Sequence, residues 1–140
     1  MKTKINFKQS IIAGLWAAIT AVIINVILFL IFHAAGIITD SVFIKPGKPM
    51  DAIQIIIASV IPVLIASIVF FLIEKYTKNG FKIFTIVSII LLVLSFLDPF
   101  MAITGITTGY ALALNLMHIV VVLALLYFIR KANKLNNAEI

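Results

Sequence analysis

The chain of 140 residues contains no cysteine and very little charge. Without cysteine it cannot form disulfides, thiolate metal sites or iron–sulfur clusters. Only 11% of its residues are charged and 64% are apolar, whereas a soluble domain is about 25% charged and about 45–50% apolar. This composition excludes a disordered chain, an ordinary nucleic-acid-binding protein and a soluble enzyme. It predicts an integral membrane protein.

Four long apolar stretches divide the sequence. A bilayer core about 30 Å thick is crossed by about 20 apolar helical residues. Helices are expected because backbone groups in lipid must form their hydrogen bonds within their own segment. The predicted fold is therefore all-α, a four-transmembrane-helix bundle that makes one membrane domain of residues 1–140. The predicted spans are residues 11–32, 52–73, 81–97 and 110–129.

The basic residues are concentrated on one side of these spans. They belong to the N-terminal segment, the second loop and the C-terminal tail: Lys2, Lys4, Lys8, Lys75, Lys78, Lys82, Arg130, Lys131 and Lys134. The opposite side has only Lys45 and Lys48. Because basic loops favour the cytoplasm, the N-terminus and the C-terminus are both predicted to be cytoplasmic. This topology accounts for the net charge of +6, so nucleic acid is not an expected partner.

Polar residues recur at one depth in the four spans. They are Asn25, Ser59, Ser95 and Asn115. Counted from the cytoplasmic ends at 1.5 Å per residue, each lies about 21 Å into the membrane. His118 lies about 17 Å in, near the middle, and Asp98 ends the third span. These six residues form a candidate polar pocket in the outer half of the bilayer.

The spacing of small and polar residues predicts which helix faces meet. The first helix has a stripe of Gly14, Ala18, Ala21 and Asn25, the second has Ser59, Pro62 and Ala66, and the fourth has Ala111, Asn115, His118 and Val122. Small residues allow close helix contact in membranes. Two interpretations remain open. The polar residues either hydrogen-bond between helices, at about 0.6 kcal/mol each, or line a small pocket that opens to the outer side. The first is favoured, because amides and hydroxyls can satisfy one another.

His118 is the most informative of these residues. It can pair with Asn115 or Asn25, relay a proton or ligate a metal. Haem ligation with His33 as the second ligand is disfavoured, because His33 lies at the outer end of its helix and His118 lies near the midplane. No catalytic motif is present. We therefore expect no cofactor, no metal site and no enzymatic activity.

Two local features carry further expectations. Proline disfavours a helical conformation at the residue before it, so the chain is predicted to break at Asp98. The Asp98 side chain is then expected to cap a short segment over residues 99–103. Trp16, in the inner half of the first helix, is expected to be a packing residue rather than an interfacial anchor.

Several short segments carry a family resemblance. They are Ile24-Asn25-Val26, Ala58-Ser59-Val60-Ile61-Pro62, Leu94-Ser95 with Pro99, and Leu116-Met117-His118-Ile119-Val120 followed by Arg130. With these segments the chain resembles a family of small four-helix bacterial membrane proteins known only as a domain of unknown function. The resemblance implies a fold and a location in the bacterial cytoplasmic membrane, and no activity.

Two functions are consistent with this sequence. The first is a non-enzymatic membrane protein that binds a small lipophilic ligand or a partner membrane protein through the candidate polar pocket. The alternative is a small oligomeric transporter or channel subunit, with His118 as a proton-linked residue. The expected partners are the lipid bilayer and either another membrane protein or further copies of the chain.

Overall fold

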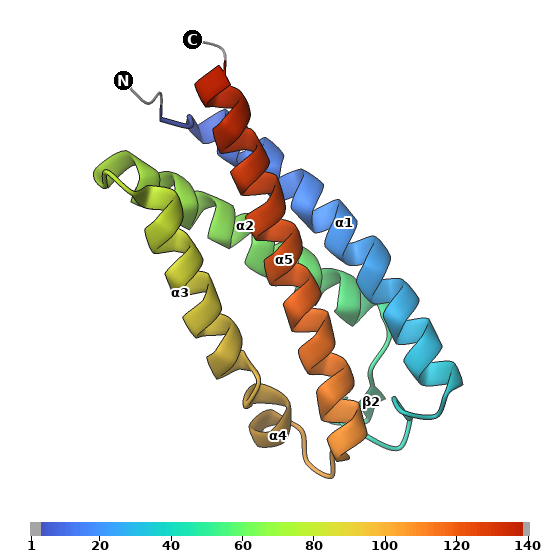
Figure 1. Cartoon of the computed structure of the whole chain (residues 1–140). Coiled ribbons are helices and arrows are strands. Elements are labelled where there is room, and N and C mark those ends of the chain that lie inside the picture. The colour runs from blue at the N-terminus through green and yellow to red at the C-terminus, as the bar shows by residue number, and fades with distance from the viewer. Residues whose placement is uncertain (1–3, 139–140) are drawn as a thin grey trace.

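The computed structural model describes residues 4–138 as long helices packed side by side (Figure 1). The helices are α1 (Phe7–Ala34), α2 (Ala52–Tyr76), α3 (Gly80–Ser95), α4 (Asp98–Ala102) and α5 (Thr108–Ala138). Within these described residues, four helical segments are long and apolar enough to cross a membrane: α1, α2, α3 together with α4, and α5. The four-helix prediction is confirmed, and the chain is a multi-pass membrane protein.

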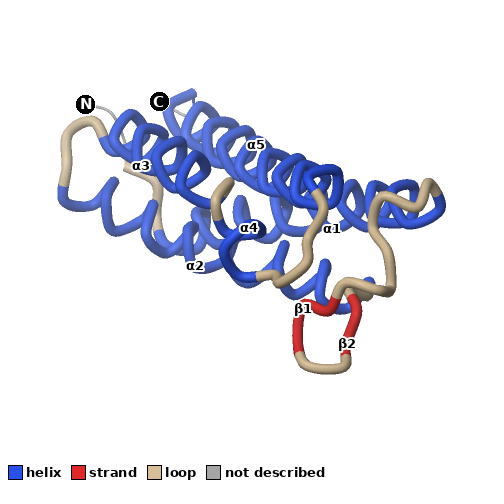
Figure 2. Tube along the Cα trace, turned by 90° about the horizontal axis from the view of Figure 1, so that it is seen from below, coloured by secondary structure: helices blue, strands red, loops and turns tan. Residues whose placement is uncertain are grey.

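The loop between α1 and α2 contains a small antiparallel hairpin of β1 (Phe43–Lys45) and β2 (Lys48–Pro49). Gly47 lies in its turn with a φ of 70°, a conformation that glycine adopts without steric cost. Figure 2 shows the hairpin projecting from one end of the helices. Before the hairpin, Ile38 and Val42 are buried against α1, α2 and α5 residues, so this end of the bundle has a core of its own.

The first two long helices begin in the same way. The side chain of Asn6 accepts a hydrogen bond from the Gln9 amide at 2.8 Å, and the Gln9 side chain accepts one from the Asn6 amide at 2.9 Å. Asp51 and Gln54 repeat this reciprocal pair at the start of α2. Each pair satisfies backbone donors that a helix start leaves free, which defines where α1 and α2 begin.

The third span differs from its prediction of one helix over residues 81–97. α3 ends at Ser95, and the separate helix α4 begins at Asp98 with Pro99 in its first turn, where a missing amide proton costs nothing. The break therefore falls just before Asp98. The expectation that Asp98 caps the next segment was wrong. Asp98 is already helical, the capping position is Leu97, and no side chain caps α4.

Both described ends of the chain lie at the same end of the bundle, next to the turn between α2 and α3 (Figure 1). Lys4 donates a hydrogen bond from Nζ to the carbonyl of Lys75 at 2.9 Å, which fastens the N-terminal segment to the end of α2. Lys2, which belongs to the predicted basic side, lies outside the described residues. The hairpin and α4 lie at the opposite end, so we call the two ends the terminal end and the hairpin end.

The most extensive contact between two helices is that of α1 with α2. Ser10 is fully buried and donates from Oγ to the Ser67 carbonyl at 2.7 Å. One turn further along α1, a Cβ atom added to Gly14 would overlap the Ser67 hydroxyl and lie 2.8 Å from its Cβ. Glycine is therefore required for the observed approach of the two helices. The predicted stripe of small residues on α1 is buried throughout, which confirms that face.

One other predicted face and one predicted packing residue need correction. On α2 the buried residues are Ile55, Ser59, Val63, Ser67 and Phe70. Of the predicted stripe, Ser59 is buried and Ala66 packs partly buried against the core, whereas Pro62 is exposed, so the prediction was wrong for Pro62. Trp16 is 57% exposed and faces away from the core. A side chain on the outer face of a membrane helix meets lipid or another membrane component, so Trp16 is not an internal packing residue.

Candidate functional site

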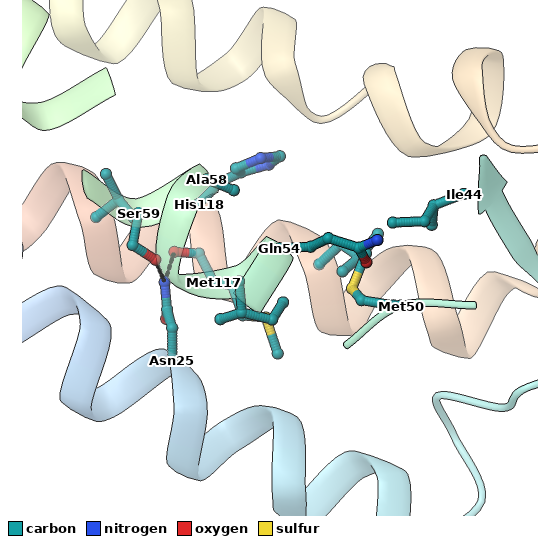
Figure 3. A pocket seen from close by; sticks show the side chains of 11 residues that line it. Asn25, Ile44, Met50, Gln54, Ala58, Ser59, Met117 and His118 are labelled. Atoms are coloured by element: carbon teal, nitrogen blue, oxygen red, sulfur yellow. Dashed lines mark hydrogen bonds between the residues drawn. The ribbon is translucent and has the colours of Figure 1, made fainter. Parts of the chain in front are cut away.

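Asn25 joins three helices at the centre of the bundle. Its side chain is only 2% exposed. The amide Nδ2 donates to Ser59 Oγ of α2 at 3.1 Å and to the Met117 carbonyl of α5 at 3.2 Å, as Figure 3 shows. Asn25 and Ser59 therefore contact each other as their common depth predicted.

The Met117 carbonyl fixes the orientation of the Asn25 amide. A carbonyl only accepts hydrogen bonds, so the nitrogen of the amide must face it. The oxygen Oδ1 therefore points elsewhere, and it is buried without a hydrogen-bond partner. A buried polar atom left unpaired costs about 1–3 kcal/mol. Asn25 thus combines a structural role with an unused acceptor.

A cavity of about 190 Å³ lies beside Asn25, on the side toward the hairpin end. Its wall comes from α1, α2, α5 and the hairpin segment. The lining residues are Asn25, Ile44, Met50, Gln54, Ile55, Ala58, Ser59, Leu114, Met117, His118 and Val121. Most of this wall is apolar, and the few polar side chains come from three different helices.

His118 forms part of the cavity wall, but it is not paired as expected. Its Nδ1 atom is buried without a hydrogen-bond partner. Figure 3 shows its ring turned away from the Asn25 amide. Neither Asn25 nor Asn115 hydrogen-bonds to it, so the predicted pairing of His118 with these amides was wrong. The histidine is a polar group in an otherwise apolar part of α5.

The other predicted pocket residues lie elsewhere. Asn115 donates from Nδ2 to the Phe96 carbonyl at 3.2 Å, which connects α5 to the break between α3 and α4. Ser95 donates to the Leu92 carbonyl of its own helix at 2.8 Å. Asp98 is exposed at the start of α4. The structure therefore brings together Asn25, Ser59 and His118 around the cavity and leaves Ser95, Asp98 and Asn115 outside its lining.

His33, considered above as a second haem ligand, has local contacts. Its Nδ1 atom hydrogen-bonds to the Ile38 carbonyl at 3.0 Å, and its ring stacks on Phe29 with a centroid distance of 5.7 Å. It holds the chain where α1 ends. Over residues 4–138, no group of three histidine or acidic side chains is arranged to hold a metal ion.

Several cavity residues were not anticipated from the sequence. Ile44 belongs to the hairpin, and Met50 and Gln54 lie at the start of α2. The pair of Asp51 and Gln54, three residues apart, indicates a capped helix start. It therefore places Gln54 close to the membrane surface. Which way the hairpin folds over the helices cannot be read from this pattern.

Comparison with known proteins gives a family and no activity. No curated protein and no solved structure matches the chain. One family model matches residues 6–134, which covers the first three membrane helices, α5 up to residue 134 and the cavity residues. Its description agrees with the resemblance noted from the sequence. The chain belongs to this family, the family of unknown function DUF6069.

Proposed function

We propose that the protein is a non-enzymatic membrane protein that binds a small lipophilic ligand in the cavity beside Asn25. The ligand is mainly apolar, has about the size of one aromatic ring and bears one hydrogen-bonding group. The observation that carries the proposal is the cavity itself, which combines apolar walls with a few polar side chains from different helices. This combination is typical of small-molecule sites.

The size of the cavity limits the ligand. Its volume is about 190 Å³, and an engineered apolar cavity of about 150 Å³ in another protein binds benzene. A benzene-sized ring with one substituent therefore matches the space. A lipid tail with its headgroup does not.

The polar wall residues select for a hydrogen-bonding group. Asn25 Oδ1 and His118 Nδ1 have no partners, and Gln54 uses its Oε1 atom for the Asp51 amide. A ligand hydroxyl both donates and accepts, so it can pair with an amide or an imidazole. Binding that pairs one of these groups recovers part of the cost of leaving it unpaired.

The test compares phenol with toluene, which has a methyl group in place of the hydroxyl. Saturation-transfer NMR is recorded on the protein in nanodiscs of deuterated lipid. We expect saturable transfer to phenol and several-fold weaker transfer to toluene. Replacement of Ala58, a small residue of the cavity wall, by phenylalanine should abolish the phenol signal by filling the space.

Ala102→Phe is the matched control, because Ala102 is exposed on α4 and does not line the cavity. It should leave the phenol signal unchanged. Equal transfer to phenol and toluene, or a phenol signal that survives in Ala58→Phe, would show that the ring partitions into lipid rather than into the cavity. Either outcome overturns the proposal.

The proposal includes a location and an orientation. The basic residues of the terminal end support placing that end in the cytoplasm, with the protein in the bacterial cytoplasmic membrane. The cavity then lies in the outer half of the bilayer. The partners are lipid and, through the outer helix faces, another membrane protein or a second copy of the chain.

The alternative function is a proton-linked transporter or channel subunit. The unpaired Nδ1 of His118 supports it, because ionisable groups inside membranes mark proton pathways. A single four-helix bundle is narrow, so this function needs an oligomer. Proton uptake into liposomes that depends on His118 would favour it over ligand binding.

A further inference from the structure

A second and larger hollow lies on the outside of the bundle, between α1 and α5 near the terminal end. Its volume is about 680 Å³. Ile12, Ala13, Trp16 and Phe128 form its apolar part, and Gln9 and Lys131 line its polar part. This hollow, the α1–α5 groove, is separate from the cavity beside Asn25 and shares no residue with it.

The groove runs from polar to apolar along α1 and α5, starting from the terminal end. Lys131 lies just outside the uncharged stretch of α5, and Gln9 is the first residue of the uncharged stretch of α1. Trp16 and Thr20 lie deeper within the α1 stretch. At 1.5 Å per residue, the distance along the helix from Gln9 to Thr20 is about 16 Å. This is about half of a bilayer core that is about 30 Å thick, or the depth of one leaflet.

The charge at the polar end of the groove is positive. Lys131 is exposed beside it, and Arg130 and Lys134 are close by on α5. Of the acidic residues in the described part of the chain, only Glu74 lies at the terminal end; Asp40, Asp51 and Asp98 lie toward the hairpin end. Basic sites between membrane helices on the cytoplasmic side favour anionic lipid headgroups.

We infer that the α1–α5 groove binds one anionic phospholipid, with its phosphate at Lys131 and an acyl chain along Ile12, Trp16 and Phe128. The match of charge to the headgroup and of apolar length to one leaflet selects this occupant. A second copy of the chain would bring another cluster of basic residues to the same place, which like-charge repulsion opposes.

Trp16 supplies the measurement, because it is the only tryptophan of the chain and lines the groove. The full-length protein is placed in nanodiscs of phosphatidylcholine with a low, equal fraction of brominated phosphatidylglycerol or brominated phosphatidylcholine. Bromine quenches tryptophan fluorescence on contact. We expect the anionic lipid to quench Trp16 more strongly, with an affinity advantage of about five-fold from one basic residue at the membrane surface.

Lys131→Gln should remove this advantage. The matched control is Lys78→Gln, which deletes the same charge from the exposed turn between α2 and α3, outside the groove lining, and should preserve it. Equal quenching by both lipids in the wild type would overturn the inference, as would an advantage that persists in Lys131→Gln. Weak quenching by both lipids would show that protein covers the groove, which also overturns it.

Discussion

The two histidines have opposite environments, which can be compared residue by residue. His118 Nδ1 is buried without a partner, whereas His33 Nδ1 bonds to the Ile38 carbonyl and its ring stacks on Phe29. Removing one partner of a hydrogen bond loses the stabilisation of that bond, whereas removing a buried polar group that has no partner removes a cost. The same substitution should therefore have opposite effects at the two positions.

We expect His118→Leu to raise the free energy of unfolding by about 1 kcal/mol, because it eliminates a buried unpaired nitrogen. His33→Leu should lower it by up to about 1 kcal/mol through loss of the Ile38 hydrogen bond. Unfolding in mixed micelles of detergent and dodecyl sulfate measures both values. A destabilised His118→Leu variant would mean that the histidine has a partner that this arrangement of helices does not show.

At the scale of the helices, the contact of α1 with α2 depends on the absence of one side chain. Gly14→Ala should cost about 1–3 kcal/mol by overpacking, because the new Cβ overlaps the Ser67 hydroxyl. Gly109→Ala is the matched control, since its nearest atom, Ile37 Cγ2, would lie 3.7 Å away. It should be neutral or slightly stabilising, because alanine favours helix more than glycine does.

A second substitution separates overlap from other causes. Ser67→Gly removes the atoms that the new Cβ meets, while the Ser10 bond to the Ser67 carbonyl is retained because it uses the backbone. In the Gly14→Ala background, Ser67→Gly should restore part of the lost stability, measured in the same micelles. If the stability changes of the two substitutions are simply additive, the cost of Gly14→Ala does not come from overlap with Ser67.

The helices also show why sequence predicts some faces and not others. Lipid and protein core are both apolar, so hydrophobicity does not distinguish the inner face of a membrane helix. On α1 the small residues and Asn25 mark that face, and the prediction was confirmed. On α2 the inner face contains Val63 and Phe70, which look no different in sequence from the lipid-facing residues, so the prediction followed Pro62 instead.

The same limit applies to the candidate pocket. Equal depth correctly paired Asn25 with Ser59, because helix rise alone fixes depth. Depth does not fix how each helix is rotated about its own axis. Asn115 therefore bonds to the Phe96 carbonyl, and Ser95 bonds to a carbonyl of its own helix. The part of the wall that comes from the hairpin depends on how a loop folds back. No periodicity in the sequence predicts how this loop folds.

At the scale of the whole molecule, the arrangement of the ends gives a test of orientation. Ser41 is exposed near the hairpin, and Lys78 is exposed in the turn at the terminal end. The chain has no native cysteine, so single variants Ser41→Cys and Lys78→Cys report one site each. With the terminal end in the cytoplasm, a membrane-impermeant maleimide should label Ser41→Cys in intact bacterial cells.

Lys78→Cys should react only after the membrane is permeabilised, because the turn between α2 and α3 then faces the cytoplasm. The fraction labelled, read as a mass shift on a gel, checks both variants in one experiment. The opposite pattern would place the basic end outside. A mixture of both patterns would indicate dual insertion.

The bonds of Asn25 also bear on the order in which the protein is made. Its bond to Ser59 joins neighbouring helices and can form once α2 has entered the membrane. Its bond to the Met117 carbonyl must wait until α5, which follows α1–α4 in the chain, has left the ribosome. Until then one face of α1 meets lipid or the insertion machinery. Truncated chains that stop before α5 should therefore be the forms that cellular proteases and insertion factors recognise.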